Sequence, residues 1–102
     1  GGEKVYTVEV ERAMLDHPKI TDALVVGLPH PRFGKMVVAV VEGNGLTQDN
    51  IDVADIQAHT RTMLADYKVP REIYAIESLQ RADNGKANYT FVTDYAQKMT
   101  SV

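Results

Sequence analysis

Residues 36–42, with the sequence MVVAVVE, constrain the fold more than any other part of the chain. The first six of these residues are apolar, and four of them are valine. A strand with one face in water alternates apolar and polar side chains, whereas an uninterrupted apolar run indicates a strand that is buried on both faces. We therefore expect residues 36–42 to form a strand that other elements cover on both sides.

Two further segments are expected to form strands. Residues 20–26 are expected to form one strand, because residues 23–26 make a short apolar run that is bounded by Gly27 and Pro29. The loop over residues 28–34 has a suitable length for this run to pair antiparallel with residues 36–42. Residues 71–78 alternate in side-chain type and follow a helical segment, so they are expected to form the third strand.

Three segments are expected to be helical. Thr7 is expected to cap the first helix, which Pro18 stops. Asp52 is expected to cap the second, whose apolar residues recur at spacings of three and four as far as Tyr67. Asn88 is expected to cap the last. The order helix, strand, strand, helix, strand, helix predicts a single α+β domain, with a small mixed sheet of about three strands and helices packed on it.

Composition excludes several classes of function. The chain has 102 residues, which suffice for one domain with a modest core, and a net charge of −3. Its 11 basic side chains form no cluster, so nucleic-acid binding is not expected. The absence of cysteine excludes disulfides and thiolate chemistry and fits a cytoplasmic protein. The longest apolar run is too short to span a bilayer.

The sequence predicts neither a metal site nor a self-contained catalytic site. It lacks the spacing of a nucleophilic triad, and it lacks both common glycine-rich phosphate-binding motifs. The three histidines, His17, His30 and His59, are scattered over a helix end, a loop and a helix. Metal ligands usually show tighter spacing or cysteine partners. His59 lies off the apolar stripe of its helix and is expected to face solvent.

The segment RADNGKANY, residues 81–89, places a lysine directly after a strong turn signal, Asn84-Gly85. Two interpretations are open from the spacing alone. Lys86 either makes a turn more soluble, or it holds an ammonium group at the tip of a loop that points away from the domain. A lysine in the second position suits chemistry that gathers negative charge, such as attack of a carboxylate on a phosphate.

Four segments together resemble one family. They are GGEKVYTVEVE at the start of the chain, HPKITDALVVGLPHPRFGKMVVAVVE, YKVPREIYAIESL and RADNGKANY near its end. In this order and at these separations, they are similar to the C-terminal domain of the adenylate-forming superfamily, the AMP-forming acyl-CoA synthetases. The resemblance covers nearly the whole chain, and it favours the functional interpretation of Lys86.

The resemblance implies what the parent enzyme does. Members of the family join a carboxylic acid to AMP from ATP with Mg²⁺, and then transfer the acyl group to coenzyme A. It implies that residues 1–102 are the mobile C-terminal domain of an acid–thiol ligase for a carboxylic acid, expected to be a fatty acid. The partner would be the N-terminal domain of the same chain, which holds ATP and the acyl pocket. Residues 1–102 alone are expected to be inactive and to bind no cofactor.

The resemblance also assigns roles to individual residues. Lys86 would be the adenylation lysine, which orients the attacking carboxylate and offsets charge at the α-phosphate. The loop residues that would support it are Arg81, Asn84 and Gly85. After a rotation of the domain, another segment would line the channel for the pantetheine arm of coenzyme A, and it consists of Gly1, Gly2 and Glu3. This role makes Gly1 and Gly2 native residues, whereas the sequence alone is equally consistent with the remnant of an expression tag.

The sequence departs from the family at two informative positions. Thr7 stands where proline is usual, and Leu79-Gln80-Arg81 replaces the usual leucine-proline-arginine, so the start of the lysine loop is expected to be less rigid. Three alternatives remain open. The chain could belong to an adenylation domain that loads a carrier protein, it could be a stand-alone α+β binding module without catalysis, or Lys86 could be chiefly a target of regulatory acylation.

Overall fold

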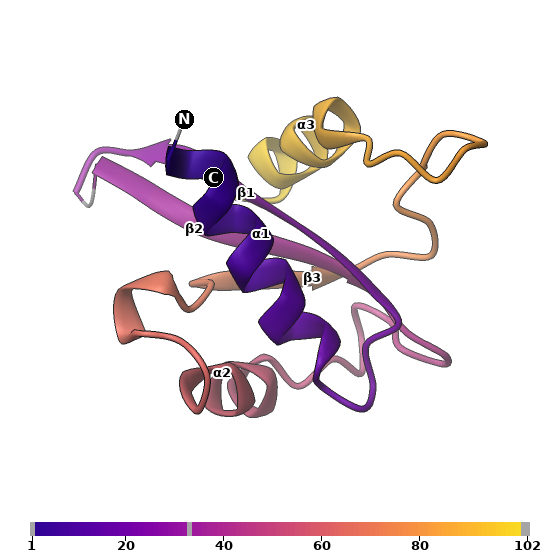
Figure 1. Cartoon of the computed structure of the whole chain (residues 1–102). Coiled ribbons are helices and arrows are strands. Elements are labelled where there is room, and N and C mark those ends of the chain that lie inside the picture. The colour runs from indigo at the N-terminus through magenta and orange to yellow at the C-terminus, as the bar shows by residue number, and fades with distance from the viewer. Residues whose placement is uncertain (1, 33, 101–102) are drawn as a thin grey trace.

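A computed structural model describes residues 2–32 and 34–100 of the chain, and side chains from residue 7 onward (Figure 1). Three helices and a three-stranded sheet form one compact unit, which confirms the predicted α+β class. In chain order the elements are helix α1 (Gly2–Leu15), strands β1 (Asp22–His30) and β2 (Gly34–Glu42), helix α2 (Val53–Arg61), the 3₁₀ turn η1 (Asp66–Lys68), strand β3 (Glu72–Ala75) and helix α3 (Tyr89–Thr100).

The sheet has the strand order β1-β2-β3, with β2 in the centre. Strand β1 pairs antiparallel with β2, as expected, and β3 pairs parallel with β2. The sheet is therefore mixed, as predicted. The third strand covers only Glu72–Ala75, which is shorter than the expected range of 71–78.

Both faces of β2 are buried, which confirms the prediction from its apolar run. Helices α1 and α2 cover one face, where Val37, Ala39 and Val41 join the larger core. Helix α3 covers the other face, where Val38 and Val40 join a second core (Figure 1). Full burial of an aliphatic side chain contributes roughly 1.5–3 kcal/mol, so this strand holds the two layers together.

The hairpin between β1 and β2 is tighter than the sequence indicated. Strand β1 continues to His30 and β2 begins at Gly34, so most of the expected loop belongs to strands. Pro29 lies within β1, opposite Lys35. A proline is tolerated there because β1 is an edge strand. Backbone N–H groups on its outer side have no neighbouring strand to which they could donate a hydrogen bond.

The predicted starts of two helices are confirmed and the third is wrong. The side chain of Asp52 accepts a hydrogen bond from the Asp55 N–H, and that of Asn88 accepts one from the Phe91 N–H. Thr7, in contrast, lies inside α1, which begins at Gly2. A cap signal marks a helix start only where the preceding residues resist helix formation, and residues 3–6 include no proline or glycine.

Helix α2 ends earlier than its apolar spacing indicated. It stops at Arg61, and the Thr62 hydroxyl then donates a 2.7 Å hydrogen bond to the His59 carbonyl. The chain turns at this point, so that Leu64 is buried while Tyr67 is 74% exposed. The prediction that the apolar face continues to Tyr67 is therefore wrong, because the helical period does not extend across this break.

Candidate functional site

The lysine loop, residues 79–88, is a closed structure. The Gly85 N–H donates to the Ala82 carbonyl at 2.7 Å, and the Ala82 N–H donates to the Lys86 carbonyl at 3.1 Å. The Asn84 side chain accepts a hydrogen bond from the Lys86 N–H at 3.0 Å. This is the bond pattern of a tight hairpin turn followed by a residue with positive φ. The Asn84-Gly85 turn expected from the sequence is thus present.

Gly85 is needed for its backbone conformation and not for space. Its φ is +84°, in the region that side chains other than glycine rarely adopt. A Cβ atom at this position would meet no other atom within 4 Å. The positive φ therefore reverses the chain immediately before Lys86, and this reversal turns the lysine side chain outward.

Arg81 joins the loop to the sheet through three hydrogen bonds. Its Nε and Nη2 donate to the two carboxylate oxygens of Asp22 at 2.7 and 2.9 Å, and its Nη1 donates to the Gly85 carbonyl at 2.9 Å. The hydrogen bond to Asp22 is the main cause that raises the pKa of Arg81. A planar guanidinium can engage a carboxylate at two points and still donate elsewhere, which a lysine cannot do with the same geometry.

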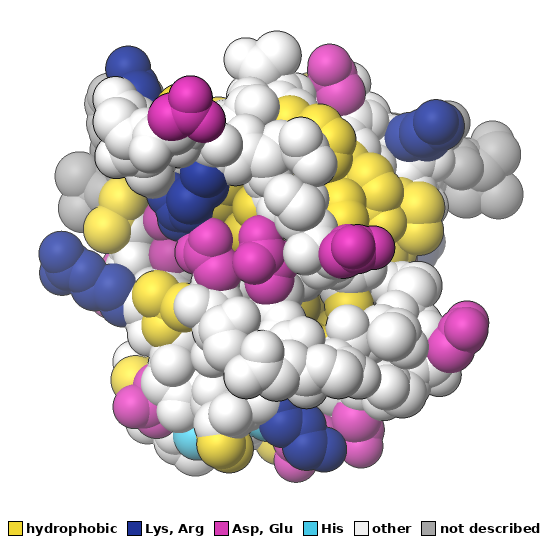
Figure 2. Space-filling view, turned by 90° about the vertical axis from the view of Figure 1, so that its right-hand side faces the viewer, with side chains coloured by type: hydrophobic (Ala, Val, Ile, Leu, Met, Phe, Trp, Pro, Cys, Tyr) yellow, Lys and Arg dark blue, Asp and Glu magenta, His cyan; other side chains and the backbone are white. Residues whose placement is uncertain are grey.

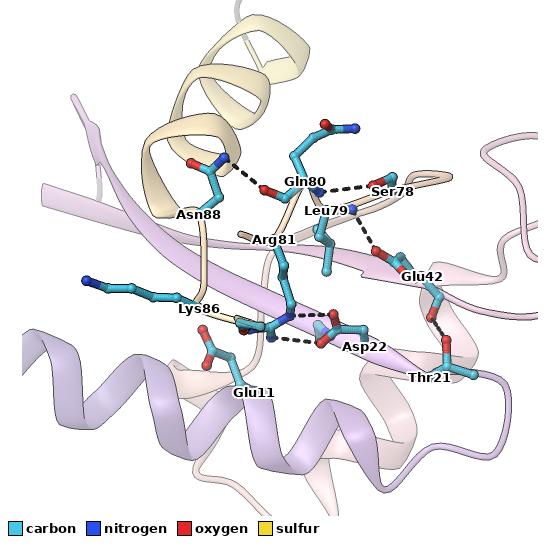
Figure 3. A network of polar contacts seen from close by, with 12 residues as sticks. Glu11, Thr21, Asp22, Glu42, Ser78, Leu79, Gln80, Arg81, Lys86 and Asn88 are labelled. Carbon is cyan, nitrogen blue, oxygen red and sulfur yellow. Dashed lines mark hydrogen bonds and ion pairs between the residues drawn. The ribbon is translucent and has the colours of Figure 1, made fainter. Parts of the chain in front are cut away.

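Both ends of the loop are also fixed (Figure 3). At its start, the Leu79 N–H donates to the Glu42 carboxylate at 2.6 Å, and the Leu79 side chain is buried in the core beneath α3. At its end, the Asn88 amide donates to the Gln80 carbonyl at 2.9 Å. Because Asn88 also caps α3, the loop and the helix that follows it are held as one unit.

A second carboxylate lies behind the loop. Glu11, on α1, accepts hydrogen bonds from the Val25 N–H at 2.9 Å and from the Tyr89 hydroxyl at 2.7 Å. Burial raises the pKa of Glu11, although these two donors and the nearby Arg81 oppose the rise. Burial and the hydrogen bond to Glu11 raise the pKa of Tyr89 to about 12, so its hydroxyl remains a donor at neutral pH.

Lys86 itself is exposed and points away from these contacts. Its side chain extends to the opposite side from the Arg81–Asp22 pair (Figure 3). Its ammonium group makes no hydrogen bond or ion pair with any residue that the structure describes. Figure 2 views the side of the molecule where the loop lies, and on this face basic side chains are scattered, while acidic ones lie both near the centre and around the edge. The lysine is therefore an isolated cation on a fixed support.

Gln80 lies at the start of the lysine loop, at the position where the resemblance leads us to expect a proline. Its φ is +57°, and its N–H donates to the Ser78 hydroxyl at 3.1 Å. A proline fixes φ near −65° and has no N–H, so it cannot occupy this conformation. Hydrogen bonds to Glu42, Ser78 and Asn88 hold this part of the chain. The expectation that the loop begins less rigidly stays a prediction.

We expect Gln80→Pro to lower the free energy of unfolding by roughly 2–3 kcal/mol, because it forces the wrong φ and removes one hydrogen bond. Gln80→Gly is the matched control, since it relieves the positive φ and keeps the N–H. Urea unfolding of the two variants measures the difference. Equal stability of Gln80→Pro and the parent chain would contradict the positive φ at this position.

The other sequence-predicted segment lies at the start of α1. Gly1 lies outside the described residues, and of Gly2 and Glu3 the structure describes only helical backbone. Their expected place beside a coenzyme A channel therefore stays a prediction.

Sequence reasoning missed a pair of histidines that the fold brings together. His17 is buried and hydrogen-bonds through Nε2 to Asp55 at 2.8 Å, and His59 does the same with Asp16 at 2.8 Å. The two rings lie 5.1 Å apart, edge to face. The hydrogen bond from His17 lowers the pKa of Asp55. His59 still has 32% of its side chain exposed, so it faces solvent in part, and the rest is covered where α1 and α2 pack together.

Neither a metal site nor a membrane span is found among residues 2–32 and 34–100. No group of three or more histidine, aspartate or glutamate side chains is placed there to hold a metal ion. No helix in this part of the chain combines the length and the apolar character needed to cross a bilayer. We assign no magnesium ligand to the described residues.

The fold and the loop together define a class of protein. The family of AMP-binding enzyme C-terminal domains matches residues 9–86, more than half of the chain, and the chain belongs to this family. The match ends at Lys86, so it covers the lysine loop as far as the lysine itself. This finding confirms the resemblance that the four sequence segments indicated.

Individual relatives specify the class further. A medium/long-chain-fatty-acid–CoA/3-oxocholest-4-en-26-oate–CoA ligase of Mycolicibacterium smegmatis is 44% identical over 98 residues, covering 96% of this chain and 17% of that protein. A 3-oxocholest-4-en-26-oate–CoA ligase of Rhodococcus rhodochrous is 43% identical over 94 residues, covering 92% and 17%. The chain thus spans about a sixth of the length of these curated relatives (17%).

Solved structures agree with these relatives. A fatty acyl CoA synthetase of Mycobacterium tuberculosis superposes with a TM-score of 0.80 at 25% identity, covering 91% of this chain and 18% of that one. The amide bond synthetase McbA from Marinactinospora thermotolerans gives a TM-score of 0.78 at 29% identity, covering 87% and 18%. The chain therefore has the fold of a C-terminal domain of adenylate-forming enzymes.

Proposed function

We propose that this chain acts as the mobile C-terminal domain of an AMP-forming acyl-CoA ligase and that Lys86 is its adenylation lysine. One observation carries the proposal: an ammonium group without a described partner stands at the tip of a loop that Arg81, Gly85 and Asn88 hold in place. A solvated surface lysine needs no such support. A cation that must meet a reaction centre on another domain does.

The chemistry of adenylation suits this arrangement. Negative charge gathers where the carboxylate attacks the α-phosphate of ATP, and a positioned cation offsets it. Because Lys86 forms no ion pair within the described chain, its charge remains available for that purpose. Arg81, in contrast, is occupied by Asp22 and acts as a support.

The relatives favour coenzyme A as the acceptor, and the name of the Mycolicibacterium smegmatis ligase, which includes medium- and long-chain fatty acids, favours a fatty acid as the acid. Both curated relatives described above are named CoA ligases, at 44% and 43% identity. The amide bond synthetase among the similar structures indicates that likeness in this domain alone does not choose the acceptor. Loading of a carrier protein therefore stays the alternative within the superfamily.

The remaining parts of the reaction belong to chain outside residues 1–102. We propose that an N-terminal domain of the same protein binds ATP with its Mg²⁺ and the acyl group, and that residues 1–102 alone are inactive. Rotation of this domain would then exchange the lysine loop for the segment at the start of α1. This chain matches 17% of the length of each relative, which fits a domain that works only together with a larger one.

The two half-reactions test the proposal in the full-length ligase. Pyrophosphate exchange into ATP reports adenylate formation, and thioester formation from a supplied acyl-adenylate reports the transfer step. Loss of the Lys86 ammonium is expected to impair the first reaction and to spare the second. Equal impairment of both would contradict the assignment.

We expect Gly2→Leu to have the opposite effect and to slow thioester formation by about tenfold or more, because a side chain would obstruct the pantetheine arm. Leucine favours a helix more than glycine does, so the change does not weaken α1. Adenylate formation by the same variant serves as the control. Normal thioester formation would remove the reason to place this segment beside the channel.

A further inference from the structure

We propose that Asp22 is a positioning residue for adenylation and that it acts on Lys86 through Arg81. This inference rests on the role proposed for Lys86. A continuous chain of hydrogen bonds connects them. Two nitrogens of the Arg81 guanidinium donate to the Asp22 carboxylate, and the third donates to the carbonyl of Gly85, the residue directly before the lysine.

Asp22 is itself fixed by the sheet. It is the first residue of β1, and its Oδ1 accepts a hydrogen bond from the Ala23 N–H at 2.9 Å. Across the antiparallel ladder it lies opposite Glu42, whose carboxylate holds the Leu79 N–H. The end of the β1–β2 hairpin thus presents two neighbouring carboxylates, one for the start of the lysine loop and one for its middle (Figure 3).

The arrangement is better suited to placement than to folding. The Asp22 and Arg81 side chains are 23% and 33% exposed, and ion pairs in contact with water contribute little to stability. Two parallel hydrogen bonds nevertheless fix the plane of the guanidinium, and with it the Gly85 carbonyl. A change at Asp22 should therefore displace the ammonium of Lys86 while leaving the domain folded.

The first test is Asp22→Asn in the full-length ligase, which keeps the size of the side chain and removes its charge. We expect the kcat of adenylate formation to fall by about tenfold with little change in the KM for ATP, because the lost contact matters in the transition state. Thioester formation from supplied adenylate should be unchanged. The matched control is Asp66→Asn, which breaks an exposed ion pair with Arg61 elsewhere on the domain.

A double-mutant cycle separates positioning from a general structural effect. In a Lys86→Ala background, Asp22→Asn should cause no further loss, because its effect passes through the lysine that is gone. Arg81→Lys keeps the charge but cannot make all three hydrogen bonds, so it should also lose adenylation and spare transfer. This second variant decides the question should Asp22→Asn prove poorly folded.

Three results would overturn the inference, and a fourth would overturn the proposed function beneath it. Additive losses in the cycle, or equal losses in both half-reactions, would mean that Asp22 supports the domain and not the lysine. Normal adenylation by Asp22→Asn would mean that Asp22 does not position the lysine. If Lys86→Ala alone leaves adenylation intact, the lysine assignment itself is wrong, and the cycle identifies that case separately.

Discussion

We expect Lys86→Ala in the full-length ligase to slow adenylate formation by about 100- to 1,000-fold. Removal of a single preorganised group that stabilises charge in a transition state typically has an effect of this size. The rest of the loop should keep its shape, because its bonds to Arg81 and Asn84 involve backbone atoms of Gly85 and Lys86. The loss therefore reports the ammonium group and not a collapse of the loop.

The matched control is Lys98→Ala, which removes an exposed lysine from the last turn of α3. It should leave both half-reactions unchanged. Lys86→Arg keeps a positive charge with a different shape and should retain only part of the activity. Pyrophosphate exchange measures the first step for all three variants. A loss in Lys98→Ala as large as that in Lys86→Ala would show that net charge, and not placement, governs the rate.

The second large effect concerns stability: we expect Gly43→Ala to lower the free energy of unfolding by roughly 3 kcal/mol. A Cβ atom at Gly43 would lie 2.1 Å from the backbone carbonyl oxygen of Lys19 and 3.1 Å from the Leu46 side chain. A backbone oxygen cannot move aside as a flexible side chain can, so two loops must separate. That loss is a large part of the total stability of a typical small domain.

Gly45 provides the control for Gly43. Its φ is +72°, but a Cβ atom there would meet nothing within 4 Å. Gly45→Ala should therefore lose only about 1 kcal/mol, from backbone strain alone. Urea denaturation of the 102-residue chain, followed by circular dichroism, compares the two variants. A larger loss at Gly45 than at Gly43 would contradict the close approach of the two loops.

Much of the fold could be predicted from local sequence. The buried central strand follows from its uninterrupted apolar residues, and the helix starts at Asp52 and Asn88 follow from their capping side chains. The capping signals act over three residues, and the strand signal acts over six. Two helix predictions failed because a local pattern lacked a boundary, one at Thr7 inside α1 and the other at Tyr67 beyond the end of α2.

The site divides in the same way. The turn at Asn84-Gly85 and the outward lysine could be predicted, because both depend on neighbouring residues. The resemblance implies that Arg81 supports the loop, but the distant partners that hold the loop could not be predicted. Arg81 meets Asp22 from 59 positions away, and Tyr89 meets Glu11 from 78. Such contacts depend on the strand register and on how the helices pack, and a single sequence carries no direct signal for either.

The dependence of the lysine loop on distant carboxylates has a consequence for protein engineering. If residues 79–88 were transplanted into another scaffold, Glu42 and Asp22 would be missing. The loop would then lose the hydrogen bonds that hold its start and its middle. Chimeric ligases built by recombination should therefore take their crossover point upstream of α1. The lysine loop and the β1–β2 hairpin that holds it would then come from the same parent protein.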